Sequence, residues 1–223
     1  MKNLSVVVPF YNEGELVVEV LSEIRRALPN AEIVAVDDGS SDGTADRIKS
    51  IPSVKLLSFQ KNCGQSAAIY AGLHAASGEI IAMMDGDGQN DPADILKLVR
   101  GLSQADVVYG VRKKRKDAFA RLISSRIANA IRRFVLGDKA SDTGCTLKVI
   151  RREHVKLLIP FNGLHRYLPA LFERAGLSFA EVAVNHRARK AGISKYTING
   201  RALRGIFDLI GVRWLMSRMI IWP

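Results

Sequence analysis

Residues Ile80–Gln89 read Ile-Ile-Ala-Met-Met-Asp-Gly-Asp-Gly-Gln, an apolar run followed at once by two aspartates one residue apart. The apolar part predicts a short buried strand. Paired carboxylates at the end of such a strand suit a hard divalent cation, because these ions prefer oxygen ligands. A polar turn capped by aspartates fits the local sequence equally well. A calcium loop of the EF-hand type does not fit, because Asn90 and Leu96 stand where that loop needs Gly and Glu.

On either side of this stretch, short apolar runs alternate with helical patterns through the first half of the chain. The expected strands are Leu4–Pro9, Glu32–Val36, Val54–Phe59, Ile80–Met84 and Asp106–Tyr109. The expected helices are Glu15–Leu28, Thr44–Ile51, Ser66–Ala76 and Pro92–Leu102, the last with Asp91 as its N-cap. This alternation predicts an α/β fold with a mainly parallel central sheet and helices on both faces. Ligands of such sheets bind beyond the carboxyl ends of the strands.

Polar residues follow several of these expected strands. The first strand leads into Pro9–Glu13, the second into Asp37–Ser40 and the fifth into Gly110–Arg112. A carboxylate after the second strand can accept hydrogen bonds from a nucleotide base or ribose, and it can also serve only to shape the turn. The chain has no G-x-G-x-x-G motif, which disfavours a nicotinamide or flavin enzyme.

Charge is distributed unevenly along the 223 residues. Residues 1–111 hold 9 Lys and Arg against 15 Asp and Glu, whereas residues 112–223 hold 24 against 7. A basic second half suits nucleic acid, anionic lipid or a phosphorylated substrate. Aromatic residues make up only 7% of the chain and no nucleic-acid module is recognisable, so nucleic acid is not an expected partner. The two cysteines form no disulfide or metal motif, which favours a reducing compartment.

Two segments of the basic half have the pattern of amphipathic helices. In Lys113–Leu136 the apolar positions are Phe119, Ile123, Ile127, Ala130 and Phe134, and the opposite face carries Arg121, Ser125 and Arg132. A second helix is expected from about Ile198 to Ile221. Four charged residues within Ala202–Trp222 argue against a membrane span there. A basic amphipathic helix is typical of the membrane interface, and packing of the apolar stripe into the core is the alternative.

Seven motifs stand in a characteristic order along the chain. They are Val8–Glu13, Val36–Thr44, Asn62–Gly64, Asp85–Gln89, Gly110–Arg112, Ala140–Cys145 and the loop from Arg189 to Lys195. Together they resemble the family-two glycosyltransferases of the GT-A fold, and within them the group similar to dolichyl-phosphate mannose synthase. The resemblance covers nearly the whole chain.

The resemblance implies a role for each of these positions. Nucleotide-sugar contacts would come from the nucleoside-binding wall Pro9, Tyr11, Glu13, Val36 and Asp38, and from Asp85 and Gly86 of the donor motif. The metal, Mg²⁺ or Mn²⁺, would be bound by Asp85, Asp87 and Gln89. The expected catalytic set is Asp87 with the cations Arg112, Arg189 and Lys195, which would surround the donor diphosphate and the acceptor phosphate.

The implied reaction is an inverting single displacement from a nucleotide-diphosphate sugar, of the mannose or glucose type, to a polyprenyl or dolichyl phosphate. A metal-bound diphosphate needs no general acid to depart. A phosphate acceptor with a second pKa of about 6 is already nucleophilic at neutral pH. Two alternatives stay open. One is a transferase for a soluble or polysaccharide acceptor, which would need a carboxylate base, and the other is a non-catalytic basic module that binds membrane or nucleic acid.

A single domain is expected, with a nucleotide-sugar half at 1–111, an acceptor half at 112–197 and an amphipathic helix at 198–223. Members of the resembled family often continue into transmembrane helices, whereas this sequence ends at Pro223. The expectation is therefore a peripheral protein on the cytoplasmic face of a membrane, or else a piece of a longer membrane protein. A membrane-anchored partner or a homo-oligomer is compatible with either case.

Overall fold

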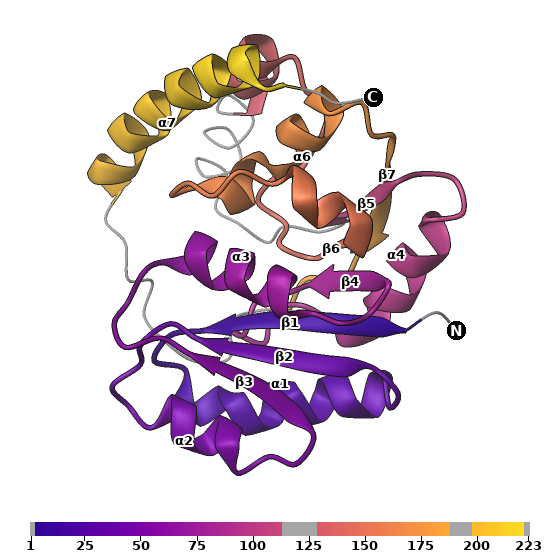
Figure 1. Cartoon of the computed structure of the whole chain (residues 1–223), viewed down its shortest axis with the longest axis vertical. Helices are drawn as coiled ribbons and strands as arrows, with labels where there is room; N and C mark the ends of the chain where they lie inside the picture. Colours follow the sequence, from indigo (N-terminus) through magenta and orange to yellow (C-terminus); the bar gives the residue numbers. More distant parts are fainter. Residues whose placement is uncertain (1–2, 113–128, 188–197, 221–223) are drawn as a thin grey trace.

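The computed structural model describes residues 3–112, 129–187 and 198–220, and it centres on one seven-stranded sheet (Figure 1). The strands are β1 Leu4–Phe10, β2 Glu32–Asp37, β3 Val54–Ser58, β4 Ile80–Met83, β5 Val107–Arg112, β6 Lys148–Arg151 and β7 Phe179–Val184. Their order across the sheet is β3-β2-β1-β4-β6-β5-β7. Every pairing is parallel except those of β6, which runs antiparallel to both β4 and β5. The expected α/β fold with a mainly parallel sheet is confirmed.

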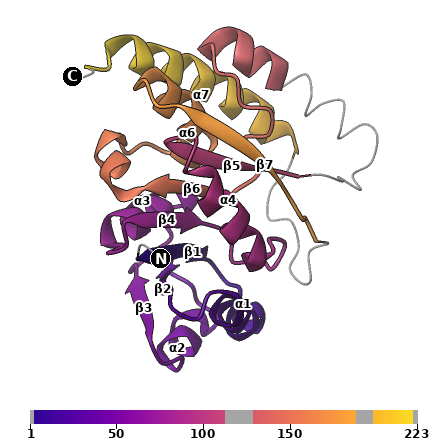
Figure 2. The same cartoon turned by 90° about the vertical axis from the view of Figure 1, so that its right-hand side faces the viewer.

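The helices lie on both faces of this sheet, with α1 and α3 on opposite sides (Figure 2). They are α1 Gly14–Ala27, α2 Thr44–Lys49, α3 Gln65–Ala75, α4 Ile95–Gly101, α6 Leu164–Arg174 and α7 Ile198–Arg218, with short 3-10 helices at Pro92–Asp94 and Arg152–Leu157. Residues 129–136 are also helical. None of the helices in the described ranges is both long and apolar enough to cross a bilayer.

The five strands and four helices expected in the first half are present, with two corrections. The expected helix Pro92–Leu102 begins as a 3-10 turn and becomes α-helical only at Ile95. Asp91 is its N-cap as expected, because its side chain accepts a hydrogen bond from the Ala93 N–H at 3.1 Å. Strand β5 also runs further than expected, so Arg112 is the last residue of the strand and does not follow it.

The helix at residues 129–136 turns its polar side inward. Arg132 is 6% exposed, whereas Phe134 is 91% exposed. Arg132 lies on the face opposite Phe134, as expected, and this polar face is turned into the protein, where its guanidinium is paired with Asp138. Of the two alternatives for the apolar stripe, packing into the core does not hold for Ala130 and Phe134, because both are exposed. The remainder of the expected helix, residues 113–128, lies outside the described residues.

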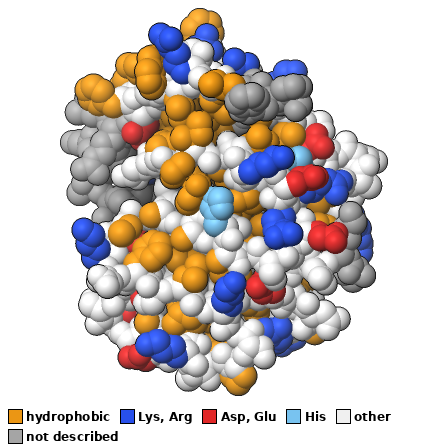
Figure 3. Space-filling view, viewed as in Figure 1, with side chains coloured by type: hydrophobic (Ala, Val, Ile, Leu, Met, Phe, Trp, Pro, Cys, Tyr) orange, Lys and Arg blue, Asp and Glu red, His pale blue; other side chains and the backbone are white. Residues whose placement is uncertain are grey.

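Large exposed hydrophobic side chains gather on helix 129–136 and on α7, which lie together at one end of the molecule (Figures 1 and 2). We call this set the apolar surface; it comprises Ile131, Phe134, Ile206, Phe207, Ile210 and Trp214. From residue 205 onward, α7 buries fully only Val212 and Met216, both against the protein. In the space-filling view, hydrophobic and basic side chains are interspersed over the end where α7 lies (Figure 3).

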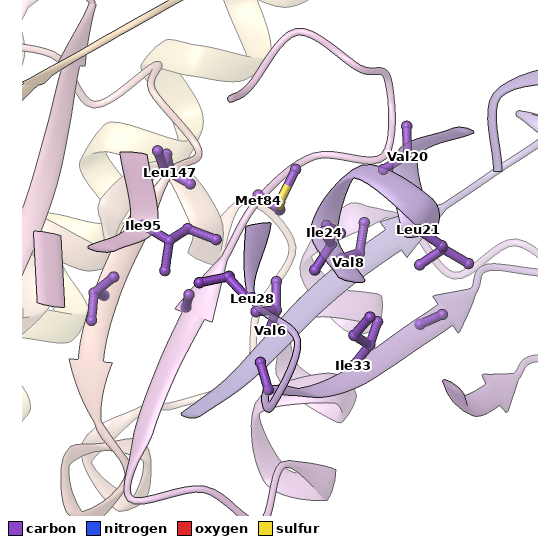
Figure 4. Close-up of a cluster of buried hydrophobic side chains, with 14 of the residues drawn as sticks. Val6, Val8, Val20, Leu21, Ile24, Leu28, Ile33, Met84, Ile95 and Leu147 are labelled. Carbon is purple, nitrogen blue, oxygen red and sulfur yellow. The ribbon is translucent and has the colours of Figure 1, made fainter. Parts of the chain in front are cut away.

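Two hydrophobic clusters hold the helices to the sheet, one on each face. Alternation along a strand feeds both, since Val6 and Val8 enter one cluster and Val7 the other. The cluster shared with α1 is shown in Figure 4. On the opposite face α3 approaches closely because Gly72 has no side chain: a Cβ there would lie 2.3 Å from Cγ1 of Val7.

Candidate active site

The strand ends that carry polar residues meet at one edge of the sheet. Because β1, β2, β4, β5 and β7 run parallel, their carboxyl ends share this edge. Antiparallel β6 brings its amino end, and the segment that precedes Lys148, to the same place. The sequence did not predict β6, so it also missed this second source of site residues.

The acidic loop follows β4 directly. Gly86 packs against the end of β1, where a Cβ would lie 2.5 Å from the Phe10 ring and 2.8 Å from the Pro9 carbonyl oxygen. Gly88 has a φ of 72°, a conformation that favours glycine. Asp87 Oδ1 accepts the Gln89 N–H at 3.1 Å, and Asp85 Oδ1 accepts a hydrogen bond from Gln65 Nε2 at 2.7 Å. Both aspartates are partly exposed, so the loop presents two carboxylates at the sheet edge.

The acidic loop is also joined to the chain that follows β7. The Arg187 N–H donates to the Gln89 carbonyl at 2.9 Å, and Gln89 Nε2 donates back to the Arg187 carbonyl at 3.4 Å. The Arg187 side chain is fixed in turn by Glu23 at 2.7 Å and Asp91 at 3.3 Å. The expected cationic residues Arg189 and Lys195 fall within 188–197, outside the described residues, but the described chain leads to them from beside the acidic loop.

The loops after β1 and β2 hold each other in place. The Asn12 N–H donates to Ser40 Oγ at 2.9 Å, and the Gly14 N–H donates to Asp42 Oδ2 at 3.0 Å. Glu13 makes a similar bond through its N–H to Thr44 Oγ1 at 3.2 Å. Asp42 and Thr44 thus accept hydrogen bonds from two N–H groups at the amino end of α1. Tyr11 is 38% exposed at the tip of this pair of loops, and Pro9 is partly exposed.

The carboxylate of Asp38 accepts hydrogen bonds from three donors of the next loop. These are the Cys63 N–H at 2.7 Å, the Gly64 N–H at 2.9 Å and Asn62 Nδ2 at 2.9 Å. Asp38 is only 3% exposed, and burial raises its pKa although the backbone donors act in the opposite direction. Its carboxylate therefore organises residues 62–64 at the start of α3.

The Val36 side chain points into the core and is 0% exposed. It packs in the cluster shared with Val7 and α3. The expectation that Val36 contributes to a nucleoside-binding wall therefore applies to its backbone alone, because the side chain is covered on all sides.

Arg112 faces the acidic loop from the end of β5. Its Nε and Nη2 each donate to Asp142 at 2.8 Å, and both side chains are 11% exposed. Gly144 leaves room for the guanidinium, since a Cβ there would lie 2.7 Å from Arg112 Nη2. Arg112 and Asp85 line one pocket, together with Gln89, Asn90, Gly144, Cys145, Thr146 and His186.

Lys148 is a second cation near this pocket, and sequence reasoning missed it. It is 2% exposed at the start of β6, and its ammonium donates to the Cys145 carbonyl. Burial lowers its pKa, while the nearby Cys145, Asp85 and Asp142 act to raise it. Gln65 was missed as well. Neither residue stands in a pattern that distinguishes it from an ordinary strand or helix position.

The donor set of the acidic loop fits a hard cation shared with a ligand. In the described ranges, no three His, Cys, Asp or Glu side chains lie close enough together to hold a metal ion by themselves. Asp85 and Asp87 supply two carboxylates, and Gln89 supplies an amide oxygen. Mg²⁺ commonly takes one or two protein carboxylates and completes its shell with phosphate and water. The loop therefore suits a metal that arrives with a diphosphate.

Comparison with known proteins matches residues 5–158 to the model of the family described as "Glycosyl transferase family 2". The chain is similar to the dodecaprenyl-phosphate galacturonate synthase of Rhizobium johnstonii, with 38% identity over 96% of this chain and 67% of that protein. It is also similar to the undecaprenyl-phosphate 4-deoxy-4-formamido-L-arabinose transferase of Serratia proteamaculans, with 33% identity over 94% and 67% of the two chains.

Among solved structures, the fold is similar to the glucosyl-3-phosphoglycerate synthase of Mycobacterium tuberculosis. The complex of that enzyme with Mn²⁺, uridine-diphosphate-glucose and phosphoglyceric acid superimposes with a TM-score of 0.75 at 23% identity, over 95% of this chain and 79% of the other. Its complex with Mn²⁺, uridine diphosphate and glucosyl-3-phosphoglycerate gives a TM-score of 0.74. The expected GT-A architecture is confirmed by this likeness.

Proposed function

The chain belongs to glycosyl transferase family 2, and we propose that it transfers a sugar from a nucleotide-diphosphate donor to a polyprenyl phosphate. One observation carries this proposal: Asp85 of the acidic loop and Arg112 line the same pocket at the carboxyl edge of the sheet. This arrangement suits two substrates that both carry phosphate groups, the donor and the acceptor. The two relatives above are named for polyprenyl-phosphate substrates, which supports the lipid acceptor.

In this proposal Asp85, Asp87 and Gln89 hold Mg²⁺ or Mn²⁺ together with the donor diphosphate. The metal, when bound, stabilises negative charge on the departing nucleoside diphosphate. Arg112 orients the phosphate groups from the end of β5, where Asp142 fixes two of its nitrogens. The acceptor is a phosphate monoester, so the chain needs no general base. From the sequence alone, Arg189 and Lys195 are proposed as further cations around these phosphate groups.

The nucleoside would lie over the loops that follow β1 and β2. Tyr11, Pro9 and Glu13 supply the accessible side of this wall. Asp38 supports it from below through residues 62–64. Because Gly86 has no side chain, the acidic loop lies close to the end of β1. The proposed metal ligands of this loop are therefore next to the proposed nucleoside contacts that follow β1.

The apolar surface supports docking on a membrane. Six large hydrophobic side chains are exposed on two neighbouring helices. Single exposed hydrophobic residues are normal on a protein surface, whereas a group of this kind marks an interaction site. Arg213 and Arg218 are exposed on α7 among them and suit anionic headgroups. A membrane-bound acceptor would then be presented to a site on a peripheral protein. The proposal places the protein on the cytoplasmic face of the membrane.

The two halves defined by the sequence form one domain in this proposal. Strands β6 and β7 come from the second half and pair with β4 and β5 of the first. The nucleotide-sugar half and the acceptor half therefore share one sheet, and no linker separates them in the described residues.

The decisive experiment is a donor and acceptor panel. Purified protein is incubated with Mn²⁺ or Mg²⁺, a polyprenyl phosphate and a series of nucleotide sugars, and the lipid fraction is analysed by mass spectrometry. The relatives are named for galacturonate and 4-deoxy-4-formamido-L-arabinose, so the panel includes uronic acid and aminopentose donors beside the expected mannose and glucose. A glycosylated lipid that is lost in excess chelator is the expected result. Transfer only to soluble acceptors, or none with any donor, would overturn the proposal.

A further inference from the structure

We propose that Arg132 is a positioning residue for the reaction, because it fixes the turn at residues 137–144 that holds Arg112. The inference rests on the proposed function, which places Arg112 beside the phosphate groups. Arg132 lies on helix 129–136, and its side chain does not line the pocket. Its action would therefore be through the turn alone.

The guanidinium of Arg132 uses all five of its N–H groups within the protein. Nε and Nη2 donate to the two oxygens of Asp138 at 2.9 Å each. Nη2 also donates to the Ala140 carbonyl, and Nη1 donates to Asn129 Oδ1 and to Thr143 Oγ1. Only a planar guanidinium can reach these acceptors simultaneously, so lysine is no substitute at this position.

The turn held by Arg132 is tied to two further elements. The Lys139 N–H donates to Glu173 of α6 at 3.0 Å. The Ser141 N–H and hydroxyl donate to Glu181 of β7 at 2.6 and 2.7 Å. Lys139 and Ser141 are thus fixed by side chains from outside the turn, in addition to the three turn residues that Arg132 contacts, which leaves Asp142 a defined position.

Asp142 transmits that position to the site. Its two oxygens receive Arg112 Nε and Nη2 at 2.8 Å, a bidentate pair in which both partners are largely buried. Gly144 of the same turn forms the wall against Arg112 Nη2. The orientation of the Arg112 guanidinium is therefore set by the turn from both sides.

A buried ion pair such as Arg132–Asp138 is weak evidence for a stability role, because desolvation offsets much of the attraction. Its geometry here has a more specific consequence. The same helix exposes Phe134 on the apolar surface and inserts Arg132 into the turn. A single short helix thus connects the proposed membrane-docking surface to the arginine of the site.

The test compares Arg132→Lys with Arg133→Lys, a matched control on the exposed neighbouring residue. Each variant keeps its charge. We expect Arg132→Lys to lower kcat about 100-fold, the effect of a misplacement of about 1 Å at a reacting centre, and Arg133→Lys to change it little. Gly144→Ala perturbs Arg112 directly, because its Cβ requires the guanidinium to move. If both variants act by displacing Arg112, the double variant should lose less than the product of the two single losses.

A spectroscopic readout separates this inference from the proposed function. In protein with isotope-labelled arginine, the Nε–H resonance of Arg112, assigned by its loss in Arg112→Lys, reports the bond to Asp142. It should shift in Arg132→Lys and in Gly144→Ala but not in Arg133→Lys. An unmoved resonance in folded Arg132→Lys overturns the positioning role, even if the protein transfers sugar as proposed. A moved resonance in a protein that glycosylates no lipid supports the positioning role and rejects the proposed function.

Discussion

Replacement of Gln65 by Ala removes a side-chain hydrogen bond to Asp85. Gln65 is the first residue of α3, and its Nε2 lies 2.7 Å from Asp85 Oδ1. Alanine is the best helix former, so the substitution leaves the start of α3 intact. The change therefore acts on the orientation of Asp85 and not on the fold.

The size of the effect follows from the charge on the acceptor. A hydrogen bond to an ionised group contributes about 1.5–3 kcal/mol, and each 1.4 kcal/mol corresponds to about tenfold in an equilibrium constant. If Asp85 is a metal ligand, the Mn²⁺ concentration for half-maximal activity should rise about 10- to 100-fold, as is typical when a group that orients a ligand is lost.

The assay is donor turnover across a Mn²⁺ titration, with thermal unfolding measured on the same samples. Gln104→Ala is the control, because Gln104 is exposed in the turn after α4. The expected result is a shifted metal dependence at nearly unchanged Tm in Gln65→Ala alone. An unshifted metal titration in both variants would refute the view that Gln65 orients a metal-binding Asp85.

Three further predictions concern stability, pH and membrane binding. Gly72→Ala should destabilise the protein by about 1–3 kcal/mol in denaturant unfolding, since its Cβ would overlap Val7; Gly211→Ala, whose Cβ meets nothing within 4 Å in α7, should instead stabilise it by about 1 kcal/mol. Burial lowers the pKa of His165 to about 3, and its Nδ1 lies 2.8 Å from Ser66 Oγ. Protonation of His165 therefore favours the unfolded state. The contribution of neutral His165 to the free energy of unfolding is fully present above pH 6.5. It is lost as the pH falls from 6.5 toward 3, by at most about 1.4 kcal/mol per pH unit. His165→Asn should show a flatter unfolding profile between pH 6.5 and 5, and an identical profile would contradict this origin. Phe207→Ser with Trp214→Ser should reduce sedimentation with anionic vesicles, whereas Val18→Ser, at a similarly exposed position on α1, should not; equal binding by all variants would exclude the apolar surface as the docking site.

The first half of the fold could be predicted because four of its five strands, β1, β2, β4 and β5, are largely buried on both faces. Such strands read as continuous apolar runs, and the helices between them repeat with a different period. The positions of Asp85, Arg112 and Asp38 at one edge then follow from parallel strand direction. Metal binding by Asp85 and Asp87 stays a prediction.

In the second half, the helix expected from about Ile198 to Ile221 is confirmed as α7 Ile198–Arg218, but other elements resisted prediction for reasons visible in particular residues. Strand β6 is four residues long and has Lys148 and Arg151 at its ends, so it lacks the apolar signal of the other strands. Helix α6 contains Pro169, which argues against a helix when read locally. Periodicity places Arg132 on the polar face of its helix, but its partners come from a turn that local sequence does not reveal.

The interleaved strand order has a consequence for biosynthesis. Within the described residues, β5 pairs with β6 and β7 alone, yet it leaves the ribosome before either. The 72 residues between the ends of β5 and β7 take on the order of 10 seconds to translate. Until β6 is translated, within the first 39 of these residues, β5 has no partner and one edge of β4 is open; one edge of β5 then stays open until β7 emerges, and unpaired edges are templates for aggregation. We therefore expect ribosome-bound chains stalled before β7 to recruit chaperones, and slower, cooler expression to raise the soluble yield.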